Sequence, residues 1–163
     1  MRLQDKVAIV SGGVGGIGSA TVKRFVQEGA TVVIADVWTD HGEEQAEELR
    51  RQGYSVTFLF LNVTDENQWE HVIQSTLQIH GRIDILVNNA GILLLESLVD
   101  TTLEVWNRLM DVNSTGAFLG TRAAVRAMLS NGGGSIINMS STAGIVGSAM
   151  ASAYDASKAS VRL

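Results

Sequence analysis

The sequence contains neither cysteine nor proline among its 163 residues. The absence of cysteine excludes disulfide bonds, thiolate zinc sites and a cysteine nucleophile. Average proline usage would give roughly eight prolines in a chain of this length, so their absence is unusual. Positive charge is scarce too, because 12 Lys and Arg residues face 17 Asp and Glu, for a net charge of −5. Since the basic residues do not cluster, nucleic acid is not an expected partner.

Long apolar runs are also missing. The longest purely aliphatic stretch, residues 92–95, is far shorter than the roughly 20 residues of a membrane-spanning helix. The start, residues 1–6, carries charges and does not resemble a secretion signal. We therefore expect a cytoplasmic protein with no membrane partner. With 45% hydrophobic and 18% charged residues, the composition is that of a globular protein, and residues 1–163 are expected to form one domain.

Short apolar runs alternate with amphipathic segments along the chain. The apolar runs predict buried strands, and the segments between them have the apolar spacing of helices. Repeated strand–helix units imply an α/β fold, a doubly wound, Rossmann-like parallel sheet that binds ligands beyond the carboxyl ends of its strands. The expected strands are 6–11, 31–36, 56–61, 83–87 and 135–139, and the expected helices are 17–28, 40–52, 65 to about 80, 103 to about 129, and 153 onward.

A glycine-rich segment joins the first expected strand to the first expected helix. It contains Gly13-x-Gly15-x-x-Gly18 and, in a second alignment, Gly12-x-x-x-Gly16-x-Gly18. A turn without side chains lets main-chain N–H groups approach a pyrophosphate at the start of a helix. In isolation such a pattern is as consistent with a flexible loop, but its place between a strand and a helix favours phosphate binding.

Asp36 ends the second expected strand, 18 residues after Gly18. This is close to the spacing of about 20 residues at which an acid binds the adenosine ribose in dinucleotide-binding folds. A carboxylate there accepts hydrogen bonds from ribose hydroxyls and repels a 2′-phosphate, and the nearby Gly15 and Val37 are uncharged. The sequence therefore predicts NAD rather than NADP as the cofactor. The alternative for Asp36 is a solvated acid at a strand end.

Tyr154 and Lys158 lie four residues apart in the last expected helix, so they share one helical face. An ammonium near a phenol favours the ionised phenolate. Such a pair can exchange a proton with an alcohol or carbonyl oxygen. A Tyr-x-x-x-Lys match alone, however, occurs on many ordinary surface helices.

Five motifs follow one another along residues 3–163: Gly12-x-x-x-Gly16-x-Gly18, Asn88-Asn89-Ala90-Gly91, Asn113, Ser140-Ser141 and Tyr154-x-x-x-Lys158. In order and approximate spacing they resemble the short-chain dehydrogenase/reductase (SDR) family. This resemblance implies an oxidoreductase that uses NAD to transfer hydride between nicotinamide and a secondary alcohol or ketone.

The resemblance implies a role for each matching residue. Tyr154 is the expected catalytic acid and base, and Lys158 favours its ionisation and holds the nicotinamide ribose. Ser141 is expected to bond the substrate oxygen, with Ser140 as the alternative, and Asn113 to hold a water in a proton relay to Lys158. The other expected cofactor-binding residues are Gly12, Gly16, Ile17, Gly18, Asp36, Asn62, Val63, Asn89, Ala90 and Gly91.

Simpler interpretations remain open for several of these residues. Asn113 inside a helix can merely bond main chain, Ser141 can cap a loop, and Asn89 can form a turn. Asn62 stands where many family members carry an aspartate that contacts the adenine amine. Its amide oxygen can still accept that hydrogen bond.

The resemblance also predicts further chain after Leu163, with two more strands and a substrate-covering loop. We therefore expect a truncated domain with a sheet incomplete at its C-terminal edge, which alone binds NAD weakly and turns over poorly. The full-length protein is expected to be a homo-oligomer. Two other functions remain open, a nucleotide-binding subunit without catalysis and an NADP-dependent ketoreductase. A set of apolar residues favours a cyclic or steroid-like alcohol as substrate, unless they belong to the core or an interface: Ile92, Leu93, Leu94, Ile145, Val146 and Met150.

Overall fold

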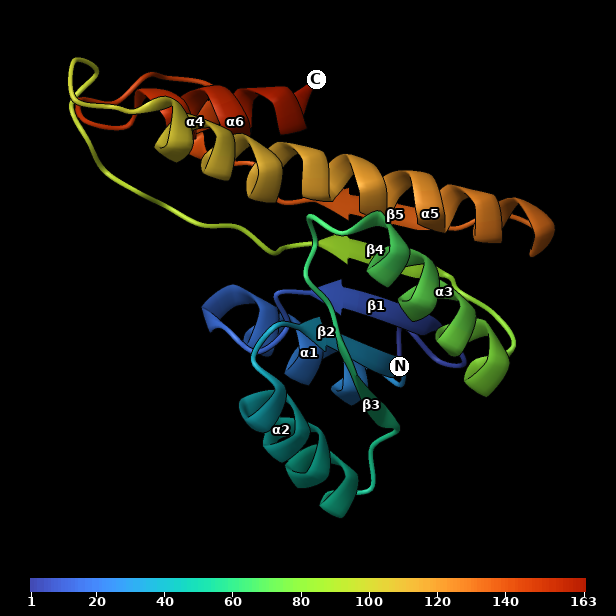
Figure 1. The fold of residues 1–163 in the computed structure, drawn as a ribbon. Coiled ribbons are helices and arrows are strands. Elements are labelled where there is room, and N and C mark those ends of the chain that lie inside the picture. The colour runs from blue at the N-terminus through green and yellow to red at the C-terminus, as the bar shows by residue number, and fades with distance from the viewer.

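The computed structural model describes all 163 residues and contains one sheet of five parallel strands. The strand order is β3-β2-β1-β4-β5, and the arrowheads of β1, β4 and β5 point the same way in Figure 1. This confirms the doubly wound, Rossmann-like architecture expected from the sequence. The strands are β1 (Val7–Ser11), β2 (Thr31–Asp36), β3 (Val56–Phe60), β4 (Ile85–Asn88) and β5 (Ser135–Asn138).

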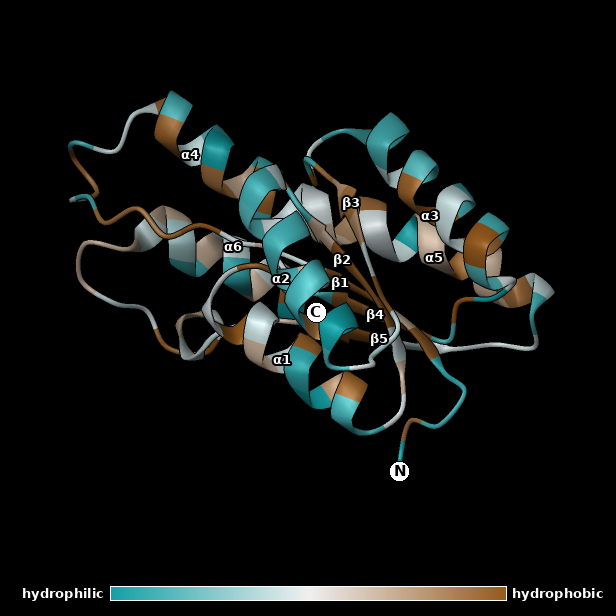
Figure 2. Cartoon of the chain, turned by 90° about the horizontal axis from the view of Figure 1, so that it is seen from below, coloured by the Kyte–Doolittle hydropathy of each residue, from teal (hydrophilic) through white to brown (hydrophobic).

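Helices cover both faces of the sheet. α1 (Gly16–Gln27) and α2 (Thr39–Arg51) pack on one face, and α3 (Glu66–His80) and α5 (Gly116–Ser130) pack on the other. Because neighbouring residues of a strand point to opposite faces, Ile9 joins the core under α3 and α5 while Val10 joins the core under α1 and α2. The strands are therefore apolar on both sides and lie as a brown layer between the helices in Figure 2.

The helix expected over residues 103 to about 129 is interrupted in a way that the sequence did not indicate. α4 (Leu103–Met110) and α5 are joined by a π-helical segment, Asp111–Thr115, without the chain leaving the helical path. The apolar spacing of this region is compatible with one uniform helix, so the wider turn was not predictable. π-Helical turns inside α-helices often occur at functional sites, and this one contains Asn113.

The remaining boundaries agree with the sequence predictions to within about two residues. Asp65 caps α3, because its side chain accepts hydrogen bonds from the main-chain N–H groups of Asn67 and Gln68. Gly29 and Gly53 follow α1 and α2 with positive φ angles, as expected for glycines that end helices. The last helix, α6 (Ser152–Arg162), packs against α4. None of the helices is both long and apolar enough to cross a membrane.

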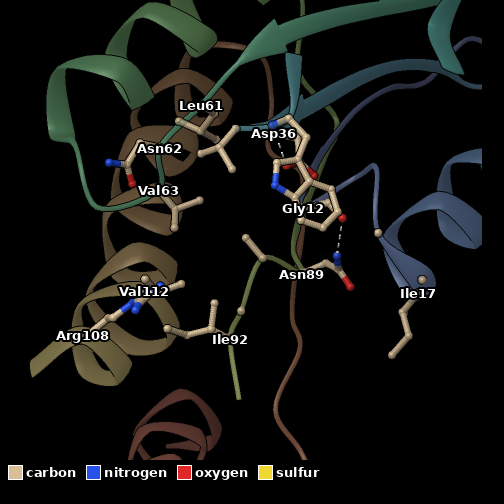
Figure 3. A pocket seen from close by; sticks show the side chains of 16 residues that line it. Gly12, Ile17, Asp36, Leu61, Asn62, Val63, Asn89, Ile92, Arg108 and Val112 are labelled. Atoms are coloured by element: carbon tan, nitrogen blue, oxygen red, sulfur yellow. Dashed lines mark hydrogen bonds between the residues drawn. The ribbon is translucent and has the colours of Figure 1, made fainter. Parts of the chain in front are cut away.

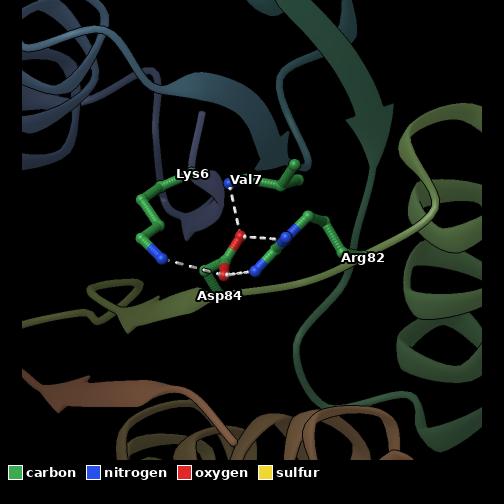
Figure 4. A network of polar contacts seen from close by, with 4 residues as sticks. All are labelled: Lys6, Val7, Arg82 and Asp84. Atoms are coloured by element: carbon green, nitrogen blue, oxygen red, sulfur yellow. Dashed lines mark hydrogen bonds and ion pairs between the residues drawn. The ribbon is translucent and has the colours of Figure 1, made fainter. Parts of the chain in front are cut away.

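An ionic cluster ties β1 to β4 at the amino ends of the strands (Figure 4). The carboxylate of Asp84, which is 8% exposed, accepts a hydrogen bond from the main-chain N–H of Val7 at 2.9 Å. Arg82 donates to both of its oxygens, at 2.9 and 2.6 Å, and Lys6 lies 3.6 Å away. Burial by itself raises the pKa of Asp84, but the hydrogen bonds and charges of these partners outweigh it and hold the pKa below its usual range. The cluster therefore fixes the sheet at the end opposite the glycine turn.

Candidate active site

The glycine turn is shaped by close packing at two of its residues and is open at two others. Gly12 has a φ of +64°, and a Cβ there would lie 2.7 Å from the Cα of Ala90. A Cβ on Gly18 would overlap the carbonyl group of Gly12. By contrast, a Cβ on Gly15 or Gly16 would meet nothing within 4 Å. Close packing thus requires glycine at positions 12 and 18, whereas Gly15 and Gly16 leave free space in front of the turn.

The start of α1 faces this free space. Gly15 is the N-cap of α1, and no side chain bonds the first N–H groups of the helix. Unpaired N–H groups and the positive end of the helix dipole favour an anion at this position. The turn therefore has the free space and the donors that a diphosphate needs.

Asp36 is buried, with 8% of its surface exposed, and is not a solvated acid. Its Oδ2 accepts a hydrogen bond from the N–H of Val14 in the glycine turn at 3.1 Å, and its Oδ1 accepts one from the N–H of Trp38 at 3.2 Å. Each carboxylate oxygen has a second lone pair for a ligand. Asp36 thus braces the turn and lines the space next to it.

A cavity of about 600 Å³ lies beyond the carboxyl ends of β1, β2 and β4 (Figure 3). Nine of the expected cofactor-binding residues line it, and Gly18 packs behind the turn. The nine are Gly12, Gly16, Ile17, Asp36, Asn62, Val63, Asn89, Ala90 and Gly91.

Several further lining residues were not identified from the sequence. Arg108 and Val112 reach the cavity from the helix that contains Asn113, and Trp38 reaches it from the turn after Asp36. No motif marks these residues, because the fold brings them to the cavity from separate parts of the chain. Leu61 was likewise not identified. Three residues already named in other connections complete the lining: Gly15, Val37 and Ile92.

The amide of Asn62 is oriented differently from the sequence expectation. Its Oδ1 accepts hydrogen bonds from the N–H of Thr64 at 3.1 Å and from the Thr64 hydroxyl at 2.9 Å. Because the N–H of Thr64 can only donate, the atom that faces it must be the oxygen. The oxygen that was expected to accept from adenine is therefore engaged within the chain, and the Nδ2 donor is left without a protein partner.

Lys158 does not line the cavity but is buried behind Gly91, which does. Its Nζ donates a hydrogen bond to the carbonyl of Met139 at 2.8 Å, and only 6% of the residue is exposed. Burial lowers the pKa of Lys158. A Cβ on Gly91 would lie 3.2 Å from this Nζ and 3.1 Å from Oδ1 of Asn113. The glycine that lines the cavity thus lets the ammonium and the Asn113 amide approach each other.

Two of the residues that the sequence singled out, Tyr154 and Ser140, lie near Lys158. Its Nζ lies 6.0 Å from the centre of the Tyr154 ring, so the two side chains share one side of α6. Ser140 donates a hydrogen bond to the carbonyl of Lys158 at 2.7 Å, whereas Ser141 accepts one from the N–H of Ala143 at 3.2 Å. The Ser140 proton is thus committed to main chain, and the Ser141 hydroxyl keeps its proton available to a ligand.

These features define an α/β protein with a Rossmann-like sheet, a cavity at its glycine turn and a Tyr–Lys pair on α6, behind the cavity-lining Gly91. The chain belongs to the short-chain dehydrogenase family, whose model matches residues 6–163.

Among its relatives, cyclopentanol dehydrogenase of Comamonas sp. (strain NCIMB 9872) is 44% identical over 162 residues, which cover 99% of this chain and 65% of the relative. An NADP-dependent (R)-specific alcohol dehydrogenase of Lentilactobacillus kefiri is 44% identical over 163 residues, 99% of this chain and 64% of the relative. The crystal structure of gox2181 superposes with a TM-score of 0.95 at 35% identity, over 98% of this chain and 63% of that one. The chain thus spans somewhat less than two thirds of the length of the proteins it matches.

Proposed function

We propose that the protein containing this chain is an NAD-dependent oxidoreductase that interconverts a secondary alcohol and a ketone. One observation carries the proposal: the open start of α1 and the Asp36 carboxylate face the same cavity, and Gly91 at its end contacts the Lys158 amine. A dinucleotide has the matching groups: a diphosphate for the start of α1, ribose hydroxyls for Asp36 and a reactive ring that would lie near Lys158.

The residues fit this cofactor. The diphosphate would lie against Gly15 and Gly16, where no side chain occupies the space, and Asp36 would accept hydrogen bonds from the adenosine ribose. Asn62 would offer its free Nδ2 donor to the ring nitrogens of adenine. When bound, the nicotinamide ring supplies the hydride chemistry.

The residues of α6 and of the segment before it, beyond the cavity-lining Gly91, would handle the proton. Tyr154 would donate a proton to a ketone oxygen or accept one from an alcohol, while Ser141 donates a hydrogen bond to the same oxygen. The Lys158 ammonium, 6.0 Å from the centre of the Tyr154 ring, would stabilise negative charge that develops at the reacting oxygens. Asn113 would hold the loop at Ile92. Its expected role in holding a water of a proton relay to Lys158 remains a prediction. The buried position of Lys158 strengthens its field at the phenol, because water screens it little.

NAD is favoured over NADP by the surroundings of Asp36. A 2′-phosphate on the ribose would meet this carboxylate, and no basic side chain lies among the neighbouring cavity residues Gly15, Val37 and Trp38. One relative is named an NADP-dependent alcohol dehydrogenase, so both cofactors belong in the test.

The substrate that we propose is an apolar, cyclic secondary alcohol. Large apolar side chains are exposed on the loop after β4 and on the segment before α6, where the substrate would approach Tyr154. One relative is named a cyclopentanol dehydrogenase. The exposed residues are Leu93, Leu95, Ile145, Val146 and Met150.

We also propose that the whole protein is a homo-oligomer in the cytoplasm. Exposed apolar residues follow one another along α5 at helical spacing, with Phe118 58% and Leu129 77% exposed, and Val125 between them. Such a stripe on a surface helix is typical of a subunit contact.

The test is the reduction of NAD and of NADP by the whole protein with cyclopentanol, measured beside the variants Tyr154→Phe and Tyr54→Phe. We expect turnover with NAD, at least about 100-fold lower kcat in Tyr154→Phe because the proton donor is lost, and unchanged kcat in Tyr54→Phe. Tyr54 is the only other tyrosine and lies outside the cavity. Faster turnover with NADP would support the ketoreductase alternative. NADH binding without turnover of any secondary alcohol would support the non-catalytic alternative.

A further inference from the structure

The carbonyl of Gly13 is buried in the glycine turn and has one hydrogen-bond donor. That donor is Nε2 of Gln45, at 3.2 Å, from a half-buried side chain on α2. Gly13 itself is tightly enclosed, since a Cβ there would lie 3.0 Å from the Ile34 side chain and from the Val10 carbonyl. Buried carbonyls almost always have a partner, so the position of Gly13 depends on this contact.

Gln45 is one of three side chains that hold consecutive residues of the turn. Asn89 donates to the Gly12 carbonyl at 2.9 Å, Gln45 to the Gly13 carbonyl, and Asp36 accepts from the N–H of Val14. Asn89 and Asp36 also line the cavity, whereas Gln45 lines a separate groove between α1 and α2. Gln45 therefore influences the turn without reaching a ligand on its other side.

The held segment leads directly into the N–H groups at the start of α1. If Gln45 cannot donate, the Gly13 carbonyl must stay unpaired or move toward water, and the turn then adopts several arrangements. A ligand that needs one arrangement binds more weakly, because ordering the turn costs free energy on binding. The weaker binding concerns only ligand groups that contact the turn, such as a diphosphate. The residues around Tyr154 and Lys158 are unchanged.

We infer that Gln45 is a positioning residue for the cofactor diphosphate, acting through the carbonyl of Gly13. The inference rests on the proposed function, because it assumes that a dinucleotide binds at this turn. It distinguishes binding from catalysis: substitution of Gln45 changes the affinity for diphosphates and leaves the rate of the bound complex alone.

The test compares Gln45→Met with Gln52→Met in the whole protein. Methionine has the length of glutamine but no N–H donor. Gln52 follows the same helix and its side chain donates only to Glu48, so it is a matched control. We expect about fivefold weaker binding of NAD and of ADP in Gln45→Met, the factor that one neutral hydrogen bond is worth, with kcat within about twofold of wild type. Gln52→Met should bind both ligands like wild type.

Adenosine, which has no diphosphate, separates this role from general damage. Its inhibition constant against NAD should be the same in wild type and Gln45→Met, and the ratio of ADP to adenosine affinity does not depend on the folded fraction. An unchanged ADP affinity in Gln45→Met, or equal losses for ADP and adenosine, would overturn the inference alone. If wild type binds neither NAD nor ADP, the proposed function fails and this inference with it.

Discussion

The side chain of Asn113 bonds both main-chain groups of Ile92: its Oδ1 accepts from the N–H at 2.8 Å, and its Nδ2 donates to the carbonyl at 2.9 Å. The same Nδ2 donates to the hydroxyl of Ser157 at 2.9 Å. One buried amide in the π-helical segment thus joins the loop after β4 to α6. This arrangement places the cavity-lining Ile92 and the helix of Lys158 in fixed positions relative to each other.

Asn113→Asp should destabilise the fold strongly. The carboxylate keeps the acceptor for Ile92 but loses both donors, and it introduces a charge at a position that is 2% exposed. We expect the free energy of unfolding to fall by about 3 kcal/mol, as measured by urea unfolding at neutral pH. The control is Asn107→Asp, on the exposed side of α4, which should change stability by no more than about 0.5 kcal/mol. Equal effects of the two variants would contradict the bridging role of Asn113.

Substitution by alanine should have different effects at two glycines of the turn, lowering stability at Gly18 and only ligand binding at Gly15. In Gly18→Ala the new methyl group overlaps the Gly12 carbonyl, which is main chain and cannot move aside without distorting the turn. We expect a loss of about 3 kcal/mol in unfolding free energy or more. In Gly15→Ala the methyl group meets open space, and the φ of −83° suits alanine.

Gly15→Ala should therefore unfold at the wild-type urea concentration but bind NADH more weakly, because the methyl group projects toward the free space in front of α1. Unfolding curves and NADH fluorescence titrations of both variants give the comparison. A Gly15→Ala protein with unchanged NADH affinity would argue against a diphosphate at this turn.

The sequence allowed the sheet, the helices and nine residues of the cavity wall to be predicted, because these depend on local patterns. Alternating apolar runs give strands, and a strand–glycine–helix sequence gives the turn. Arg108 and Gln45 could not be predicted, since their contacts join elements that are distant along the chain. The orientation of the Asn62 amide was likewise set by Thr64, whose competing hydrogen bonds the residue type does not reveal. The π-helical turn around Asn113 was missed because one extra residue in a turn leaves no clear mark on apolar spacing.

Lys158→Met should separate stability from function. The ammonium is buried and its pKa is lowered by burial, so its charged form opposes folding, and methionine removes that cost while keeping most of the volume. Methionine also loses the hydrogen bond to the Met139 carbonyl, which offsets this gain, so we expect a thermal unfolding midpoint close to that of wild type. At the same time kcat/KM should fall by at least about 100-fold, because the reacting oxygens beside Tyr154 lose the positive charge that stabilises them. A less stable variant that keeps its activity would show that Lys158 is a structural residue.

The ionic cluster at Asp84 should make stability depend on pH in the acid range. The pKa of this carboxyl is held below its unfolded value, so the folded state favours the charged form. Its contribution is complete at pH values above the unfolded pKa of about 3.9 and is lost as the pH falls through the lower folded pKa. Asp84→Asn should therefore be about 2 kcal/mol less stable than wild type at pH 7, and this difference should shrink below about pH 4 and disappear in stronger acid.

Asp40→Asn, at an exposed acid without an ion pair, is the control and should follow wild type within about 0.5 kcal/mol at every pH. Urea unfolding at a series of pH values measures the difference, and a gap between wild type and Asp84→Asn that stays constant down to the lowest pH would mean that packing, and not the charge of Asp84, stabilises this end of the sheet.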